Sequence, residues 1–198
     1  MIALVDYGAG NLTAVRTALN ALGAEVAVAR TAADLDAARA VVVPGVGNFQ
    51  RTSTLDRDWR AGILDGIDRG RPLLGICLGL QWLFEGSTEA PDSEGLSLMT
   101  GLCDRLEADG PLKVPHVGWN TLQFPRASRL FEGIAEGSQV YFTHSYAAPV
   151  THDAIAVTTH GVKFASAVER GHVFGVQFHP EKSGDVGLRV LRNFLDAL

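Results

Sequence analysis

The sequence predicts an α/β fold: a single domain with a central mixed, mostly parallel sheet flanked by helices, plus short antiparallel strands in the C-terminal half. Its 198 residues fit one domain, at the usual ~100 to 200 residues per domain. In the first 80 or so residues, short uninterrupted apolar runs alternate with helical stretches, which is typical of a parallel sheet covered on both faces. After about residue 100 the runs alternate and are separated by glycine and proline, as in antiparallel or mixed strands.

The N-terminal half opens with an expected strand at residues 2–6 and a helix after it. Asn11 stands at the N-cap position, apolar residues recur at the helical period through residues 12–22, and Gly23 ends the helix. The other elements expected in this half are strands at 25–29, 40–43 and 72–77 and helices near 59–69 and 80–85.

The C-terminal half is expected to hold five strands and a final helix. The strands lie at 120–124, 139–143, 154–159, 163–169 and 172–178. The helix spans about residues 185–197, with its apolar residues on one side. The stretch 86–113 matches no pattern that we can assign, and we expect Cys103 within it to be inert. Because no linker, low-complexity tract or repeat interrupts the chain, we expect one domain over residues 1–198.

The composition excludes several classes of protein. With 46% hydrophobic and 20% charged residues, the chain is neither a disordered protein nor a collagen nor a small disulfide scaffold. No apolar run approaches the ~18 residues that a membrane helix needs, so we expect no membrane association. The N-terminus reads directly as a strand, without an export signal, so we expect a cytoplasmic protein.

Charge and ligand patterns narrow the possible partners. The net charge is −5 and no Lys/Arg cluster is present, so nucleic acid is not an expected partner. Cys77 and Cys103 form no CxxC, and the six histidines form no HExxH, so we expect no metal site. The GxG at Gly8 and Gly10 lacks the third glycine of a dinucleotide fingerprint, because Thr13 stands there.

A candidate nucleophile lies in the segment from Gly75 to Gly79, where an apolar strand meets a predicted helix. G-x-nucleophile-x-G at such a turn is the pattern of a nucleophile elbow, and Cys77 stands at the nucleophile position. The alternative is a buried cysteine that only packs. A free cysteine with pKa ~8.5 is only about 3% thiolate at pH 7, so catalysis needs a base nearby.

The best candidate for that base is His179. It follows a strand and precedes Pro180 and Glu181, and residues i and i+2 of an extended segment face the same way, so Glu181 can fix the tautomer of His179. Cys77, His179 and Glu181 would then form a Cys-His-Glu triad. The surroundings of the other histidines favour packing or exposed turns; they are His116, His144, His152, His160 and His172.

Acyl chemistry also requires donors to a developing oxyanion. The backbone N–H of Leu78 is one natural donor, because it follows the nucleophile. The turn at residues 44–47, PGVG, could supply a second, since its glycines permit unusual backbone conformations. The alternative is an ordinary turn that ends the strand at 40–43.

Taken together, these motifs resemble those of the class I, triad-type glutamine amidotransferases. The resemblance rests on PGVGNF, GICLGLQ and GVQFHPEKS, in the family's order across essentially the whole chain. VDYGAGN at 5–11, VPHVGWN at 114–120 and YFTHSY at 141–146 are similar to the histidine-biosynthesis members of the family, the glutaminase subunits of imidazole glycerol phosphate synthase.

The resemblance implies a reaction and a set of roles. Cys77 would attack the side-chain amide of glutamine, His179 would pass the proton to ammonia, and Glu181 would orient His179. Val46, after a rearrangement of PGVG, and Leu78 would hold the oxyanion through their amides. The residues that would bind glutamine are Gly47, Gln81, His144 and Ser145.

The family's partner is a (β/α)8-barrel cyclase that receives the ammonia, and the family uses no cofactor in this subunit. By position in the motifs, the interface with the cyclase would include Asn11, Trp119, Tyr141 and Lys182. Three alternatives stay open: a glutaminase subunit of another class I amidotransferase, a standalone cysteine hydrolase, and a non-catalytic subunit that keeps the fold.

Overall fold

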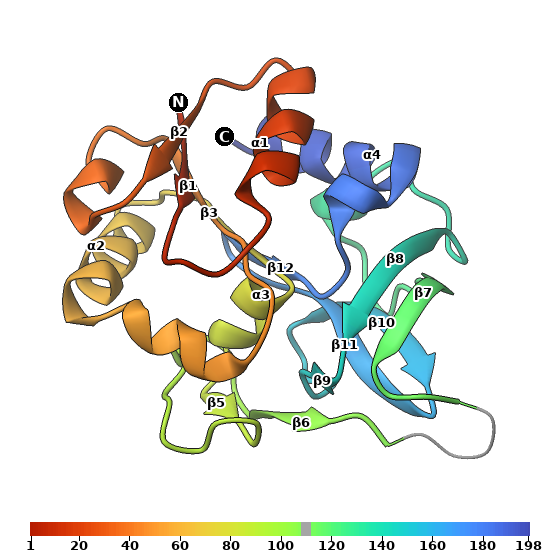
Figure 1. Cartoon of the computed structure of the whole chain (residues 1–198). Coiled ribbons are helices and arrows are strands. Elements are labelled where there is room, and N and C mark those ends of the chain that lie inside the picture. Colours follow the sequence, from red (N-terminus) through yellow and green to blue (C-terminus); the bar gives the residue numbers. More distant parts are fainter. Residues whose placement is uncertain (108–111) are drawn as a thin grey trace.

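The centre of the protein is a seven-stranded sheet (Figure 1) in a computed structural model that describes residues 1–107 and 112–198. Four neighbouring pairs, from β12 to β2, are parallel, and the two pairs at the other edge are antiparallel. The predicted mixed, mostly parallel sheet is therefore confirmed. In spatial order its strands are β10 (Ala154–His160), β11 (Val162–Arg170), β12 (Val173–Val176), β4 (Leu73–Ile76), β3 (Ala40–Val43), β1 (Ile2–Val5) and β2 (Val26–Ala29).

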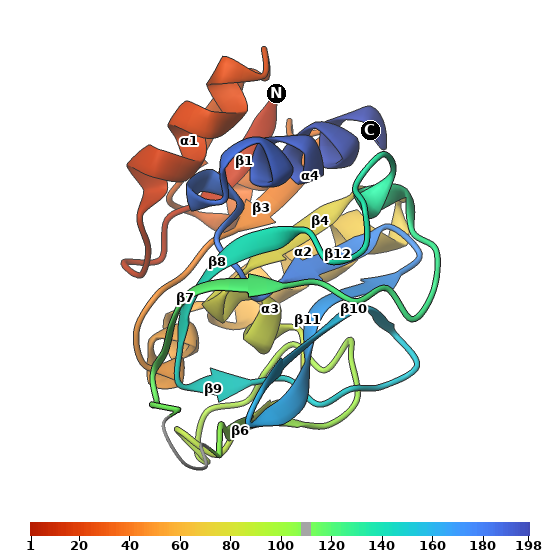
Figure 2. The same cartoon turned by 90° about the vertical axis from the view of Figure 1, so that its right-hand side faces the viewer.

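Helices cover both faces of this sheet, as the continuous apolar strands predict. One face packs against α1 (Leu12–Ala21) and α4 (Gly184–Asp196), which lie side by side in Figures 1 and 2. The other face packs against α2 (Arg57–Asp68) and α3 (Leu78–Trp82). Successive strand residues alternate between the two cores: Ala3 and Val5 of β1 belong to one, Ile2 and Leu4 to the other.

Local sequence signals set the ends of the helices. The side chain of Asn11 accepts a hydrogen bond from the Ala14 N–H and caps α1, and Gly23 just beyond the helix has a positive φ of 84°. Asp56 caps α2 in the same way. Short 3-10 turns complete the helical elements: η1 (Ala32–Leu35), η2 (Phe49–Thr54), η3 (Arg129–Phe131) and η4 (Pro180–Lys182).

Two small sheets lie beside the main one. The first pairs β7 (His116–Thr121) with β8 (Gln139–His144), and the second joins β5 (Gly86–Ser87), β6 (Leu102–Arg105) and β9 (Tyr146–Ala147). The strand expected at 120–124 is wrong in its bounds, because antiparallel pairing with β8 begins at His116, and Gln123 only forms an isolated bridge to Val157. The helix expected at 80–85 begins earlier, at Leu78, directly after the elbow.

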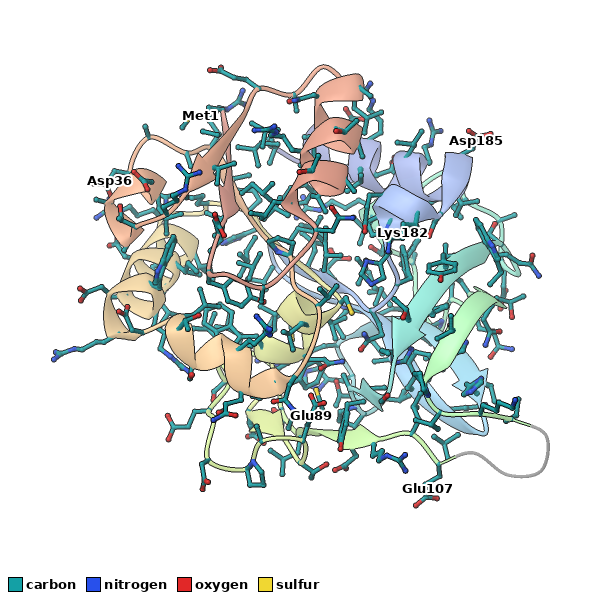
Figure 3. All side chains as sticks on the ribbon, viewed as in Figure 1. Met1, Asp36, Glu89, Glu107, Lys182 and Asp185 are labelled. Carbon is teal, nitrogen blue, oxygen red and sulfur yellow. The ribbon has the colours of Figure 1, made fainter. Side chains whose placement is uncertain are left out.

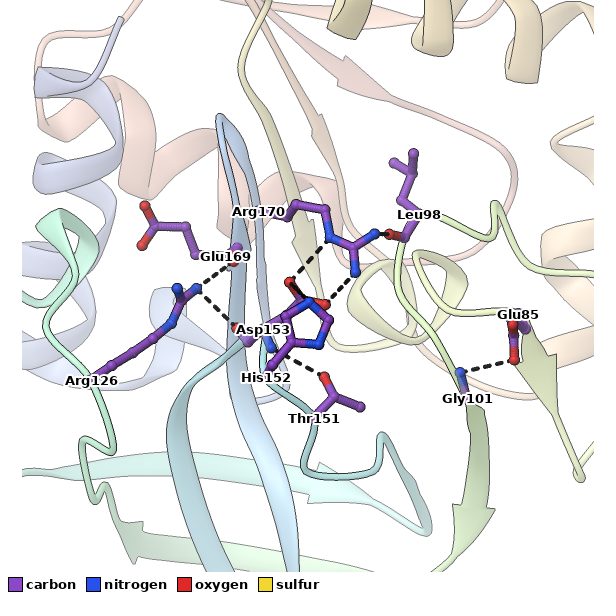
Figure 4. A network of polar contacts seen from close by, with 9 residues as sticks. All are labelled: Glu85, Leu98, Gly101, Arg126, Thr151, His152, Asp153, Glu169 and Arg170. Carbon is purple, nitrogen blue, oxygen red and sulfur yellow. Dashed lines mark hydrogen bonds and ion pairs between the residues drawn. The ribbon is translucent and has the colours of Figure 1, made fainter.

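A hydrogen bond from Arg170 of β11 anchors the unassigned stretch 86–113 to the main sheet, and an ion pair with Asp153 holds Arg170 in place. Asp153, at the edge of β10, is buried and accepts two hydrogen bonds from Arg170, at 3.1 Å from Nε and 2.6 Å from Nη2. Arg170 also donates to the carbonyl of Leu98 (Figure 4). Residues 108–111 of the stretch lie outside the described residues.

In the described part of the chain, no helix is long and apolar enough to cross a membrane, and a location in the cytoplasm stays a prediction.

Candidate active site

Cys77 lies at the sharp turn between β4 and α3, with a positive φ of 54° that is strained for a residue with a side chain. The flanking glycines make this turn possible. A methyl group on Gly75 would overlap the backbone of Gly79, and one on Gly79 would overlap the carbonyl of Val43. The backbone of Cys77 is fixed by a 2.7 Å hydrogen bond from its N–H to the carbonyl of Val176. The structure thus has the backbone of a nucleophile elbow at the predicted position.

His179 and Glu181 meet next to this turn, because β12 is the parallel neighbour of β4. His179 Nδ1 lies 2.9 Å from Glu181 Oε1, and the two side chains are only 3% and 1% exposed. The expected extended path between them is wrong: His179 is extended, but Pro180–Lys182 forms the 3-10 turn η4, since proline is well suited to begin a helical turn. The turn still brings the carboxylate back to the imidazole.

The charge state of His179 follows from these contacts. Burial alone disfavours the imidazolium, but the contacts with Cys77 and Glu181 outweigh burial and raise the pKa of His179 to about 9. Because Nδ1–H donates to Glu181, Nε2 is the nitrogen left to exchange a proton with Cys77, and it is buried without a hydrogen-bond partner among the described residues. This is the arrangement that the predicted triad requires of Cys77, His179 and Glu181.

Gln177 is a neighbour of Cys77 that the sequence analysis did not single out. Its Nε2 lies 3.6 Å from Cys77 Sγ, and its Oε1 accepts a 3.1 Å hydrogen bond from Gln81 Nε2. Gln81 Nε2 also donates to the carbonyl of Tyr146, at 2.8 Å. The alternation of residues along β12 could have drawn attention to Gln177, because Val176 pairs with Ile76 and the residues that follow them, Gln177 and Cys77, lie side by side.

One predicted oxyanion donor is already bonded within the protein. The N–H of Leu78 donates to the carbonyl of Gly45 at 3.3 Å, and Val46, next in the turn, is exposed. Tyr7 packs against this turn so closely that a methyl group on Gly45 would overlap its hydroxyl. That hydroxyl is buried and has no hydrogen-bond partner among the described residues. The N–H groups of Leu78 and Val46 could both face an oxyanion only if the carbonyl of Gly45 turned away from Leu78.

A cavity of about 330 Å³ lies beside Cys77. It is lined by the predicted residues Gly47, Cys77, Leu78, Gln81, His144 and Ser145, and by Asn48, Glu89, Pro115, Thr143 and Tyr146. Glu89, labelled in Figure 3, comes from the stretch that the sequence left unassigned. One of its carboxylate oxygens is held by the N–H of Phe49 at 2.8 Å. No pattern around Glu89 in the sequence marks it, because the fold alone brings it to the cavity.

Three of the predicted interface residues lie together on the outside of this region. Trp119 of β7 is 54% exposed, and its ring centroid is 6.1 Å from that of Tyr141 on β8. Lys182 Nζ lies 5.8 Å from the ring of Tyr141. The fourth, Asn11, caps α1, so its side chain has a structural role of its own.

Within the described ranges, no group of three or more His, Cys, Asp or Glu side chains is arranged to hold a metal ion.

Comparisons with known proteins find relatives over nearly the whole chain. Residues 3–198 match the family described as glutamine amidotransferase class-I. The imidazole glycerol phosphate synthase subunit HisH of Moorella thermoacetica is 47% identical over 197 residues, which cover 98% of this chain and 93% of that protein. The subunit of the same name from Bacillus thuringiensis is 42% identical over the same shares.

Solved structures show the same fold at low identity. A crystal structure of a glutamine amidotransferase has a TM-score of 0.76 and 20% identity, and covers 100% of this chain and 98% of that chain. The structure of PurLQS from Thermotoga maritima also has a TM-score of 0.76, with 19% identity over 98% of this chain and 97% of that chain.

Proposed function

This chain belongs to the class I glutamine amidotransferase family, and from that premise we propose that it hydrolyses glutamine as the HisH-type subunit of imidazole glycerol phosphate synthase. The ammonia would serve the cyclase subunit in histidine biosynthesis. The observation that carries the proposal is the arrangement of Cys77, His179 and Glu181 beside the cavity.

The first half of the reaction makes a thioester. Because the pKa of His179 is raised to about 9, its Nε2 holds the proton of Cys77 before the attack. Cys77 Sγ then attacks the side-chain amide carbon of glutamine, and the new C–S bond leaves a tetrahedral oxyanion. The oxyanion collapses, the C–N bond breaks, and His179 gives the proton to the departing ammonia. Glu181 stays ionised and holds Nδ1–H, so that Nε2 is always the nitrogen that carries the shuttled proton.

The second half releases glutamate. Water enters from the cavity and attacks the thioester carbon, and His179 takes its proton. The C–S bond then breaks, the proton returns to Sγ, and the thiol is restored. No cofactor takes part in either half of this scheme.

The oxyanion donors supply a reason for dependence on a partner. Leu78 can stabilise the oxyanion only after its N–H leaves the carbonyl of Gly45, and Val46 can add a second N–H only if the turn changes at the same time. We therefore expect the isolated chain to be a poor glutaminase, and a bound cyclase to favour the rearranged turn.

The cavity wall suits the polar groups of glutamine. Glu89 offers a carboxylate for the α-ammonium group, and Gly47 and Ser145 line the same space. Gln81, whose amide nitrogen is engaged by Tyr146 and Gln177, can accept with its remaining oxygen. His144 completes this wall.

The proposed partner is a (β/α)8-barrel cyclase that docks on Trp119, Tyr141 and Lys182, with Asn11 at the margin. Val117 and Trp119 project from the outer side of β7, 57% and 54% exposed, and an exposed tryptophan is a frequent anchor of protein interfaces. The lysine adds a positive charge beside this apolar patch.

The test is a glutaminase assay with and without a cyclase subunit and its nucleotide ligand, using the wild type and Cys77→Ala. We expect strong stimulation of the wild type, and no glutamine-driven synthesis by Cys77→Ala, whose complex still makes product from added ammonium. Cys103→Ala is the matched control, because Cys103 is also a buried thiol but does not line the cavity, so this variant should keep its activity. Equal loss of both syntheses in Cys77→Ala would contradict the proposal, and full activity of the isolated chain would favour a standalone hydrolase.

A further inference from the structure

Both ring nitrogens of His144 are engaged by the protein itself. Nδ1 lies 2.9 Å from the carbonyl of Tyr146, so Nδ1 must carry the proton. Burial lowers the pKa of His144 to about 3, so the ring is neutral and Nε2 is an acceptor. The partner of Nε2 is His116 Nδ1, at 3.1 Å. His144 therefore needs a donor from His116 to satisfy its buried lone pair.

The tautomer of His116 is fixed in turn by Asn120. Burial lowers the pKa of His116 to about 4, so this ring is also neutral, and since Nδ1 donates to His144, Nε2 must accept. Asn120 Nδ2 lies 3.2 Å from His116 Nε2 and donates as well to the carbonyl of Thr159. The Thr121 N–H donates to Asn120 Oδ1 at 2.8 Å, which fixes the orientation of the amide.

Aromatic stacking holds the ring of His116 in place. His160 stacks on it with centroids 4.0 Å apart, and Phe142 stacks with centroids 4.8 Å apart. Of the two roles expected for His160, packing or exposure in a turn, the contacts show packing: its Nε2–H donates to the carbonyl of Lys113, and its ring covers His116. The ring of His116 thus has little freedom to turn away from His144.

This chain of donors ends in the wall of the cavity. Thr143, His144, Ser145 and Tyr146 all line the space beside Cys77, and the Tyr146 carbonyl accepts from both His144 and Gln81. A turn of the His144 ring would break the bond to Tyr146 and shift this wall. We propose that His116 is a positioning residue for glutamine binding, which fixes the tautomer of His144 and with it the shape of the cavity.

The proposal rests on the proposed function, because it concerns the glutamine pocket of that same site. It also connects two features of β7. His116 and Asn120 point inward from this strand, whereas Val117 and Trp119 are exposed on its outer side. A displacement of β7 by a docked partner would therefore reach the cavity through the bond between His116 and His144.

The deciding variants are His116→Phe and His116→Asn. Phenylalanine keeps an aromatic ring between His160 and Phe142 but has no donor for His144. Asparagine loses the ring but can place an N–H where Nδ1 stood. A merely structural role for His116 predicts that His116→Phe is better tolerated than His116→Asn. A positioning role predicts that His116→Asn is better tolerated.

The first readout is ¹⁵N NMR of the histidine rings in the isolated chain. We expect a neutral His144 with the proton on Nδ1 in the wild type and in His116→Asn, and a changed Nε2 signal with an upward shift of its titration in His116→Phe. The second readout is glutamine hydrolysis by the complex with the cyclase. In His116→Phe we expect KM for glutamine to rise about tenfold, which corresponds to about 1.4 kcal/mol, with kcat changed less than about twofold. His116→Asn should stay within about threefold of the wild-type KM.

Asn120→Leu keeps the test decisive if position 116 does not tolerate a change. It removes the donor to His116 from a half-buried position, so we expect a mixture of His116 tautomers and a smaller rise in KM. Unchanged ring signals and KM in His116→Phe and Asn120→Leu, in an active complex, would overturn the positioning role alone. If no variant, including the wild type, hydrolyses glutamine with the cyclase present, the proposed function fails, and the part of this inference that concerns glutamine fails with it.

Discussion

Replacing Glu181 by Gln tests how the base is held. The glutamine side chain has nearly the same shape, and its carbonyl oxygen can still accept from His179 Nδ1, so the change removes charge while keeping the geometry. If Glu181 acts through its charge, the loss of stability in Glu181→Gln must depend on the protonation of His179. If Glu181 acts only by packing, that loss must be the same whether or not His179 is protonated.

The size of the effect follows from the pKa of His179. A rise from 6.5 to about 9 corresponds to about 3 kcal/mol in favour of the imidazolium, since a tenfold change in a protonation equilibrium is worth about 1.4 kcal/mol. Cys77 is the larger favourable contributor and Glu181 the next, so we assign about 1 kcal/mol to the carboxylate. Because the folded pKa lies above the unfolded one, this contribution is complete below about pH 6.5 and disappears as the pH rises through 9.

Urea unfolding, followed by the fluorescence of the three tryptophans, measures this difference. At pH 6 we expect Glu181→Gln to lower the free energy of unfolding by about 1 kcal/mol, and at pH 9.5 we expect the difference to vanish or reverse. Glu25→Gln, an exposed carboxylate elsewhere, should show no such dependence. In the complex, kcat should fall by at least about 100-fold, because base catalysis needs the correct tautomer. A loss of stability that is equal at pH 6 and pH 9.5 would refute this reasoning.

Two further substitutions test the elbow and the surface. Gly79→Ala should destabilise the protein by more than about 3 kcal/mol in thermal unfolding, because a Cβ there would overlap the Val43 carbonyl. Gly62→Ala, on α2 with only ordinary contacts, should instead stabilise it by about 0.5 kcal/mol, and equal effects would count against the steric argument. Trp119→Ala should weaken binding of the cyclase at least about tenfold in calorimetry, with a small change in Tm, because its side chain is exposed. A large fall in Tm without a loss of affinity would show that the residue only packs.

The parts of the fold that the sequence predicts well are those encoded by neighbouring residues. The strand Leu73–Ile76 is a continuous apolar run, Asn11 is a good N-cap, and Gly23 permits the positive φ after α1. The elbow belongs to the same class at Gly75, where the excluded side chain would clash within the turn itself; the clash at Gly79, with the carbonyl of Val43 on β3, is a long-range contact. Each of these features is visible within a few residues of sequence.

The parts that it misses depend on contacts between distant residues. β7 begins at His116, whose polar ring hides the start of a strand until stacking by Phe142 and His160 is known. Glu89 is an ordinary loop carboxylate until the fold brings it to the cavity. Gln177 is a buried amide whose partners, Cys77 and Gln81, stand 100 and 96 residues earlier in the chain. In each case the residue type alone is compatible with a solvated surface.

The meeting of Cys77 and His179 is of this second kind, and backbone pairing explains why the long intervening chain does not disturb it. The parallel register sets Ile76 beside Val176, so Cys77 continues one strand where Gln177 continues the other. A slip of one residue would turn every side chain of β12 to the opposite face, which the two buried cores forbid. Beyond the strand, the N–H of His179 donates to the carbonyl of Tyr141 at 2.9 Å, and the Ser183 hydroxyl donates to the carbonyl of His179 at 2.7 Å. The base is thus held by main-chain bonds on both sides, so only the ring and its proton remain free to take part in the chemistry.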